Sequence, residues 1–120
     1  MASKKIVETF NTQLMKFFTE VCKLYPDNRD FKSIKGQIRT AITVNEKLPI
    51  KMFYEAVVKD YRDQVLKRDE DFFLNFDVSG TEMESLNYIK TIWREADEGV
   101  KSSVYKYVLL LTRLCDKYHS

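Results

Sequence analysis

The sequence predicts an all-α fold, a single-domain bundle of about five helices over residues 1–120 with an acidic and aromatic loop near mid-chain. Three observations lead to this prediction. Apolar residues recur at steps of three and four along most of the chain, which is the spacing of one helix face. Only 3 glycines and 2 prolines are present, so few positions favour a turn. No segment shows the alternation of apolar and polar residues that is typical of a strand.

The first half of the chain predicts three helices. The apolar stripe of the first runs over residues 6–25 and stops at Pro26. A second helix is expected over residues 30–44, because the segment "DNRD" before it can cap its start. Pro49 suits the first turn of a third helix, where its missing N–H would have no partner in any case. Residues 60–67 either extend this third helix or form a separate turn.

The second half predicts two more helices. Thr81 and Glu84 have the spacing of a capping box, which indicates the start of a fourth helix that ends near Gly99. The last helix has the most regular spacing of apolar residues, over residues 100–118. Between the halves lies "LKRDEDFFLNFDVSG", residues 66–80, in which "FFLNF" fits either a loop or a short extended piece.

Apolar runs and cysteine use predict where the protein works. The longest uncharged apolar run, residues 107–112, is far shorter than the roughly 20 residues that cross a bilayer. The first ten residues do not have the pattern of a secretion signal. Cys22 and Cys115 are far apart on apolar helix faces, so we expect reduced thiols that pack in the core. We therefore expect an intracellular protein without membrane contact.

The supply of reactive side chains argues against an enzyme. His119 is the only histidine and stands next to last, which disfavours catalysis by a nucleophile and a base. Two distant cysteines and one histidine do not match a zinc site. Gly36, Gly80 and Gly99 do not form a phosphate-binding loop. We expect no catalytic residue, no cofactor, no metal and no small-molecule substrate.

The acidic and aromatic stretch after Arg68 is open to two interpretations. No Lys or Arg occurs between positions 69 and 84, but the carboxylates do not have the spacing of a calcium loop. In the first interpretation the aspartates cap a turn and the phenylalanines fold back onto the bundle, which leaves the acids in water. In the second the same side chains form an exposed surface for a protein partner. The candidate contact residues are Asp69, Asp71, Phe72, Phe73, Phe76 and Trp93.

The basic residues suggest a different partner. Residues 1–60 carry 11 Lys and Arg against 7 Asp and Glu, whereas residues 61–120 carry 9 against 11. Four of the cations fall largely on the side of the second helix away from its apolar stripe, where they can face phosphates. These candidate residues for nucleic-acid binding are Arg29, Lys32, Lys35 and Arg39.

Three segments together resemble a known group of proteins. They are "FNTQLMKFFTEVCKLYPDNRDFKSIK", "QVLKRDEDFFL" and "IWREADEGVKSSVYKYVLLLTRL". Their order resembles small helical proteins of unknown function encoded by large nucleocytoplasmic DNA viruses, especially those of algae and protists. Tyr105 or Tyr107 stands where that group has a tryptophan in the last helix. The resemblance implies a viral origin and a place in the infected cell's cytoplasm or in the virion, and it implies no catalytic residue.

Two functions follow as expectations. The first is a non-enzymatic viral protein that acts through protein–protein contacts, with a viral partner or another copy of itself, as a minor virion or assembly component. The alternative is an accessory protein of viral transcription or replication that binds nucleic acid.

Overall fold

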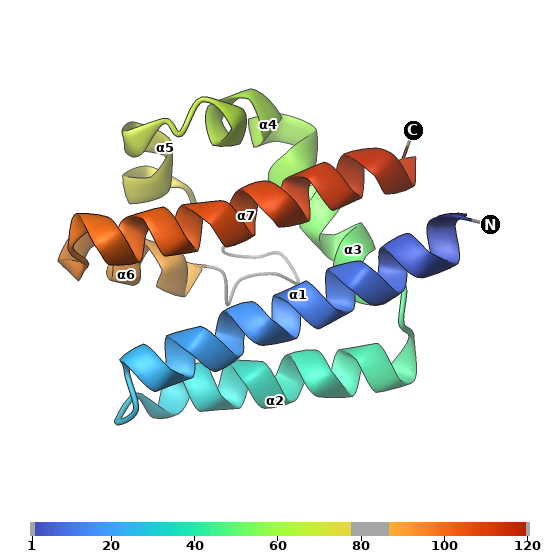
Figure 1. Ribbon diagram of the computed structural model, residues 1–120, viewed down its shortest axis with the longest axis horizontal. Coiled ribbons are helices and arrows are strands. Elements are labelled where there is room, and N and C mark those ends of the chain that lie inside the picture. Colours follow the sequence, from blue (N-terminus) through green and yellow to red (C-terminus); the bar gives the residue numbers. More distant parts are fainter. Residues whose placement is uncertain (1, 78–86, 120) are drawn as a thin grey trace.

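The computed structural model describes residues 2–77 and 87–119, and every regular element within these ranges is helical (Figure 1). The elements are α1 (Ala2–Leu24), α2 (Arg29–Val44), α3 (Leu48–Phe53), the π-helical turn η1 (Tyr54–Val58), α4 (Lys59–Leu66), α5 (Glu70–Asn75), α6 (Tyr88–Glu95) and α7 (Glu98–His119). The prediction of an all-α fold is confirmed. Since α3, η1 and α4 run on without a break, the described ranges hold six helices rather than about five, and the unexpected one is α5.

The long helix α1 lies at the centre of the bundle. It packs against α7 on one side and α2 on the other, and Figure 1 shows the three running side by side. The segment α3–η1–α4 packs on α7, and α5 pairs with α6. Helix α2 packs on α1 and α3 and forms an outer edge of the molecule. Several residues of α2 that point away from α1, among them Lys32 and Arg39, are exposed.

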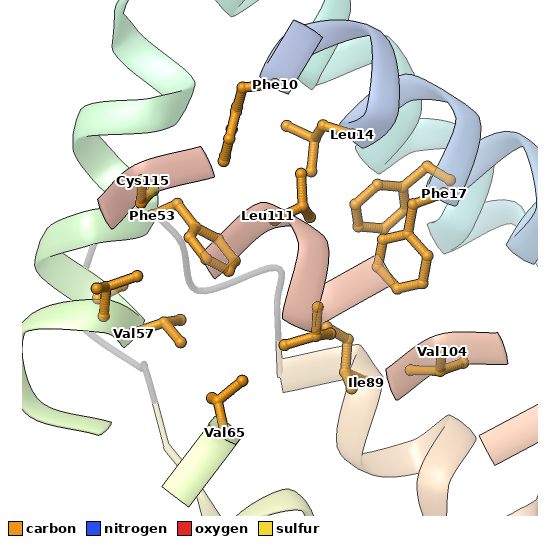
Figure 2. Packing of buried hydrophobic residues seen from close by; sticks show 14 of the residues in the cluster. Phe10, Leu14, Phe17, Phe53, Val57, Val65, Ile89, Val104, Leu111 and Cys115 are labelled. Atoms are coloured by element: carbon orange, nitrogen blue, oxygen red, sulfur yellow. The ribbon is translucent and has the colours of Figure 1, made fainter. Parts of the chain in front are cut away.

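One hydrophobic cluster joins these helices. Figure 2 shows side chains from α1, α3, α7 and the shorter helices meeting between the ribbons, among them Phe10, Phe53 and Leu111. Each comes from the apolar stripe of its own helix, and burying one such side chain stabilises the fold by roughly 1.5–3 kcal/mol. Cys115 belongs to this cluster, and burial raises the pKa of its thiol. Cys22 is half-buried, and both thiols are free.

The π turn lies where the third predicted helix enters the core. The N–H of Lys59 donates to the carbonyl of Tyr54, five residues earlier, which is the bond of a π-helix. Three consecutive residues, Ala56, Val57 and Val58, are buried there. The helix then continues to Leu66, so residues 60–66 extend it rather than form a separate turn.

The helix boundaries follow local chemistry. The side chain of Asn28 caps α2 by accepting from the N–H groups of Asp30 and Phe31, at 2.9 and 3.2 Å. Pro49 lies in the first turn of α3, as predicted. Gly99 does not end the fourth predicted helix, because α6 stops at Glu95 and a new helix, α7, already includes Gly99. The predicted capping box of residues 81 and 84 lies outside the described residues.

Candidate functional site

The mid-chain stretch forms a helical corner rather than an extended piece. Asp69 caps the short helix α5, and its Oδ1 accepts from the N–H groups of Asp71 and Phe72, at 3.0 and 3.3 Å. The expectation that "FFLNF" is extended or a loop is therefore wrong for most of it. Six residues are too few to display a helical period, which is why the sequence pattern alone did not identify α5.

The phenylalanines of the corner point inward. Phe73 and Phe76 are 1% and 7% exposed, whereas Phe72 is half-buried and packs on Tyr61 with ring centroids 5.2 Å apart. Together they help to line a cavity of only about 20 Å³. Asp71 remains exposed. These positions match the interpretation in which the aromatics close onto the bundle and the acids stay in water.

Trp93 closes the corner from α6. Its side chain is fully buried and lies flat against Phe73, with ring centroids 4.4 Å apart and an interplanar angle of 15°. Its indole N–H donates to Glu70 Oε2 at 2.6 Å. Phe73, Phe76 and Trp93 therefore cannot offer their side chains to a partner in this conformation. Of the predicted contact residues, Asp71 is exposed, and Asp69 and Phe72 are half-buried.

Arg68, which the sequence did not single out, holds the corner to α7. Its φ of 51° is left-handed, and its N–H donates to the carbonyl of Val65 while that of Asp69 donates to Gln64. This is the Schellman arrangement that ends many helices, usually with glycine at the position that Arg68 occupies. A glycine at position 68 would have indicated a helix end in the sequence, whereas an arginine gives no such indication.

The side chain of Arg68 accounts for that departure from glycine. Its guanidinium lies 5.5 Å from the ring centroids of both Trp93 and Tyr105, within cation–π range. It also donates a hydrogen bond to Glu98, which lowers the pKa of that carboxyl. Tyr105 in turn donates its hydroxyl to the carbonyl of Leu66 at 3.2 Å. These contacts connect α4, α6 and α7, so the corner is a structural junction.

The four predicted nucleic-acid residues lie together on the outer helix α2. Arg29, Lys32 and Arg39 are exposed and Lys35 is half-buried. Asp30 is the single acid of this helix, and no ion pair joins any of the four cations to a carboxylate in the described part of the chain. We call the surface formed by these four residues the basic face of α2.

One residue in the middle of this helix is a glycine, Gly36. Gly36 is exposed, and a Cβ added to it would have no other heavy atom within 4 Å beyond its own helix backbone. Its φ is not in the left-handed range. A glycine inside a helix costs about 1 kcal/mol relative to alanine, and packing among the described residues does not account for this one.

A groove lies between η1, α4 and the end of α7. This groove has a volume of about 420 Å³. Tyr54 stacks on His119 with ring centroids 3.9 Å apart, and Arg62 pairs with Asp116 at 2.8 Å. In each pair the two side chains contact each other, and both pairs join the segment η1–α4 to α7. Within residues 2–77 and 87–119, no group of three or more His, Cys, Asp or Glu residues is arranged to hold a metal ion.

Across the same two ranges, no helix combines the length and the apolar character needed to cross a lipid bilayer. Searches of protein-family models, of curated proteins and of solved structures gave no match to this chain.

Proposed function

We propose that this protein is a non-enzymatic accessory factor that binds nucleic acid through the basic face of α2. The observation that supports the proposal is a row of four cations on an outer helix, with no carboxylate paired to any of them in the described ranges. A cation already paired with a carboxylate gains little from a phosphate, whereas an unpaired one releases the counterions that the phosphate had condensed.

The dimensions of this face suit a polyanion. Arg29 and Arg39 are ten residues apart, which corresponds to about 15 Å along a helix. A DNA duplex presents on the order of nine phosphate charges over that length. A contact of these cations with the phosphate backbone would carry no base sequence. The implied viral origin would place this activity in transcription or replication within an infected cell.

The test is a salt titration with a matched control. Binding of fluorescein-labelled duplex DNA of mixed sequence is followed by fluorescence anisotropy for the wild type and for the double variant Lys32→Gln/Arg39→Gln. The control is Lys106→Gln/Arg113→Gln, which removes one Lys and one Arg, also exposed and seven residues apart, from α7. The slope of log K against log salt should fall by about two charges in the α2 variant and much less in the control.

Three results would contradict the proposal. The first is the absence of binding by the wild type at about 50 mM salt, where phosphate contacts are strong. The second is an equal loss in both double variants, which would mean that net charge and not the α2 face sets the affinity. The third is binding to polyglutamate without binding to DNA, which would assign the face to an acidic protein.

A second candidate is the contact with a protein partner, in the virion or during assembly. One observation favours it, the exposed carboxylate of Asp71 beside the half-buried ring of Phe72. Pull-down from infected cells with the wild type and with Asp71→Lys, followed by mass spectrometry, tests this candidate. A partner that is retained by the wild type and lost from the variant would support it, whereas identical sets of captured proteins would end it.

A further inference from the structure

A groove lies between α1 and α2, beside the basic face. Its volume is about 480 Å³, and its lining consists of six residues of α1, among them Met15, and of Ile42 from α2. Lys35 and Arg39 precede Ile42 by seven and three residues, which places all three along one side of α2. The basic face therefore continues into this concave surface, which we call the α1–α2 groove.

The opposite side of the α1–α2 groove is also positively charged. Lys16 lines it from α1, is exposed, and forms no ion pair with any residue that the structure describes. Among the described residues of the lining, the one acid is Glu20, whose carboxylate pairs with Lys23 at 3.6 Å. An anionic chain can therefore find cations on both sides of the groove.

Asn11, also in the lining, carries a buried acceptor without a partner. Its side chain is 7% exposed, and its Nδ2 donates to the backbone carbonyl of Glu46 at 2.8 Å, which fixes the orientation of the amide. Its Oδ1 has no hydrogen-bond partner among the described residues. Because a buried acceptor is costly to leave unpaired, a ligand that brings an N–H donor gains affinity at this atom.

The walls of the α1–α2 groove are apolar and adaptable. Met15 follows Asn11 by four residues, and a helical side chain leans towards the preceding turn, so Met15 extends over Asn11. A methionine side chain changes its conformation easily and makes favourable contacts with aromatic rings. Ile42 faces it from α2, and both side chains are half-buried. The groove is therefore suited to a flat ring that carries a donor on its edge.

An unpaired nucleobase has these properties. Its faces can pack on apolar side chains, its pairing edge carries N–H groups, and phosphates flank it along the chain. In a duplex the faces are stacked on neighbouring bases and the pairing donors are already used. The α1–α2 groove thus favours a single strand over a duplex.

We infer that the protein binds single-stranded nucleic acid, with one base in the α1–α2 groove between Met15 and Ile42 and an N–H of that base donating to Asn11 Oδ1. The phosphates beside this base contact Arg39 on one side and Lys16 on the other. This inference rests on the proposed function and names the class of nucleic acid that the basic face takes.

The test compares two labelled strands of equal charge. One is an oligothymidylate of about 15 nucleotides, and the other is an abasic strand of the same length, which keeps every phosphate and has no base. Fluorescence anisotropy at about 50 mM salt measures the affinity of the wild type for each. The wild type should bind the oligothymidylate roughly tenfold more tightly, because only this strand can fill the groove.

Substitutions in the α1–α2 groove should remove this preference for the strand with bases. Ile42→Ser, Met15→Ser and Asn11→Ala should each bring the two affinities close together and leave binding of the abasic strand unchanged. Val44→Ser is the matched control, since Val44 is a β-branched apolar residue of the same helix, is 76% exposed and does not line the groove. It should keep the roughly tenfold preference. Circular dichroism confirms that each variant used is folded.

The outcomes separate this inference from the proposed function. A preference that is lost in the folded groove variants and kept in Val44→Ser supports the inference. Equal affinity of the wild type for both strands overturns it, and the proposed function stands if Lys32→Gln/Arg39→Gln weakens binding of both. A preference that survives in all three groove variants, or is lost equally in Val44→Ser, also overturns it. If the wild type binds neither strand and no duplex, the proposed function fails as well.

Discussion

The indole N–H of Trp93 donates to Glu70 Oε2 at 2.6 Å, so a buried ring on α6 and a largely exposed carboxylate on α5 are tied together. Two helices of six and eight residues would be marginal on their own. The contact fixes how they meet, and the stacked ring of Phe73 completes the join.

Replacement of Trp93 tests this bond. Trp93→Phe keeps a ring against Phe73 but removes the donor and part of the buried volume, so the free energy of unfolding should fall by about 2 kcal/mol. Urea denaturation measures the change. Glu70→Gln keeps an acceptor oxygen and should cost less than about 1 kcal/mol. Full wild-type stability in Trp93→Phe would show that the bond contributes nothing.

Two substitutions at Arg68 separate its side chain from its backbone. Arg68→Ala loses the contacts with Trp93, Tyr105 and Glu98 and keeps a Cβ at a left-handed φ, so it should cost about 2 kcal/mol. Arg68→Gly loses the same contacts but relieves the backbone, and it should recover about 1 kcal/mol of that loss. Chemical denaturation of both variants gives the difference. A glycine variant less stable than the alanine variant would rule out backbone strain at this position.

The ion pair at Glu98 should make stability depend on pH. The hydrogen bond from Arg68 lowers the pKa of Glu98 from its ordinary 4.5, so the folded state holds this carboxyl deprotonated more strongly than the unfolded state does. The contribution is present above the unfolded pKa and is lost as pH falls through the lowered folded pKa. The urea midpoint of the wild type should therefore decrease more between about pH 7 and about pH 3 than that of Glu98→Gln.

Glu8→Gln serves as the control for this pH dependence. It removes an exposed carboxylate of α1 for which the described residues show no ion pair. Its midpoint should follow the wild type across the whole range. Equal decreases of the urea midpoint in Glu98→Gln and in the wild type would show that the lowered pKa of Glu98 does not contribute to the pH dependence of stability.

Neighbouring phenylalanines of the corner should differ sharply in their contribution. Phe73 is 1% exposed, so Phe73→Ser leaves a cavity and a buried hydroxyl and should destabilise the fold by about 4 kcal/mol. Phe72 is half-buried, and Phe72→Ser should cost only about 1 kcal/mol. Circular dichroism during urea titration compares them. Equal losses would mean that Phe72 supports the fold as much as Phe73 does.

The long helices were predictable because each presents an apolar stripe long enough to establish a period. The stripes that end at Pro26 and Tyr118 and the turn at Pro49 correspond to α1, α7 and α3 within a few residues. Short features lacked such a signal. Helix α5 has six residues, and the end of α4 uses Arg68 where glycine would have been recognisable. The end of α6 was misplaced because Gly99 suggested a stop, while Asp97 Oδ1 accepts from the N–H of Val100 and starts α7.

Of the two candidate sites, the sequence predicted one and could not decide the other. The basic face of α2 follows from helical spacing, and the exposed positions of Arg29, Lys32 and Arg39 agree with it. The spacing could not show whether Trp93 is buried or exposed, because an aromatic side chain suits a core and a contact surface equally well. Only the packing of α5 on α6 decides between them. The same holds for Gly36, since its open surroundings become visible only in three dimensions.

The π turn holds one residue more than an α-helical turn, because its hydrogen bond spans five residues instead of four. Removing one residue from positions 54–58 should therefore restore an ordinary α-helical turn and leave every later side chain on its present face. Val65 would stay buried and Arg68 would still face Trp93. A deletion within α4 has no such extra residue to remove, so it would rotate every later side chain by about 100° around the axis. The π turn is therefore the place where this helix can change its length during evolution without disconnecting the corner from the bundle.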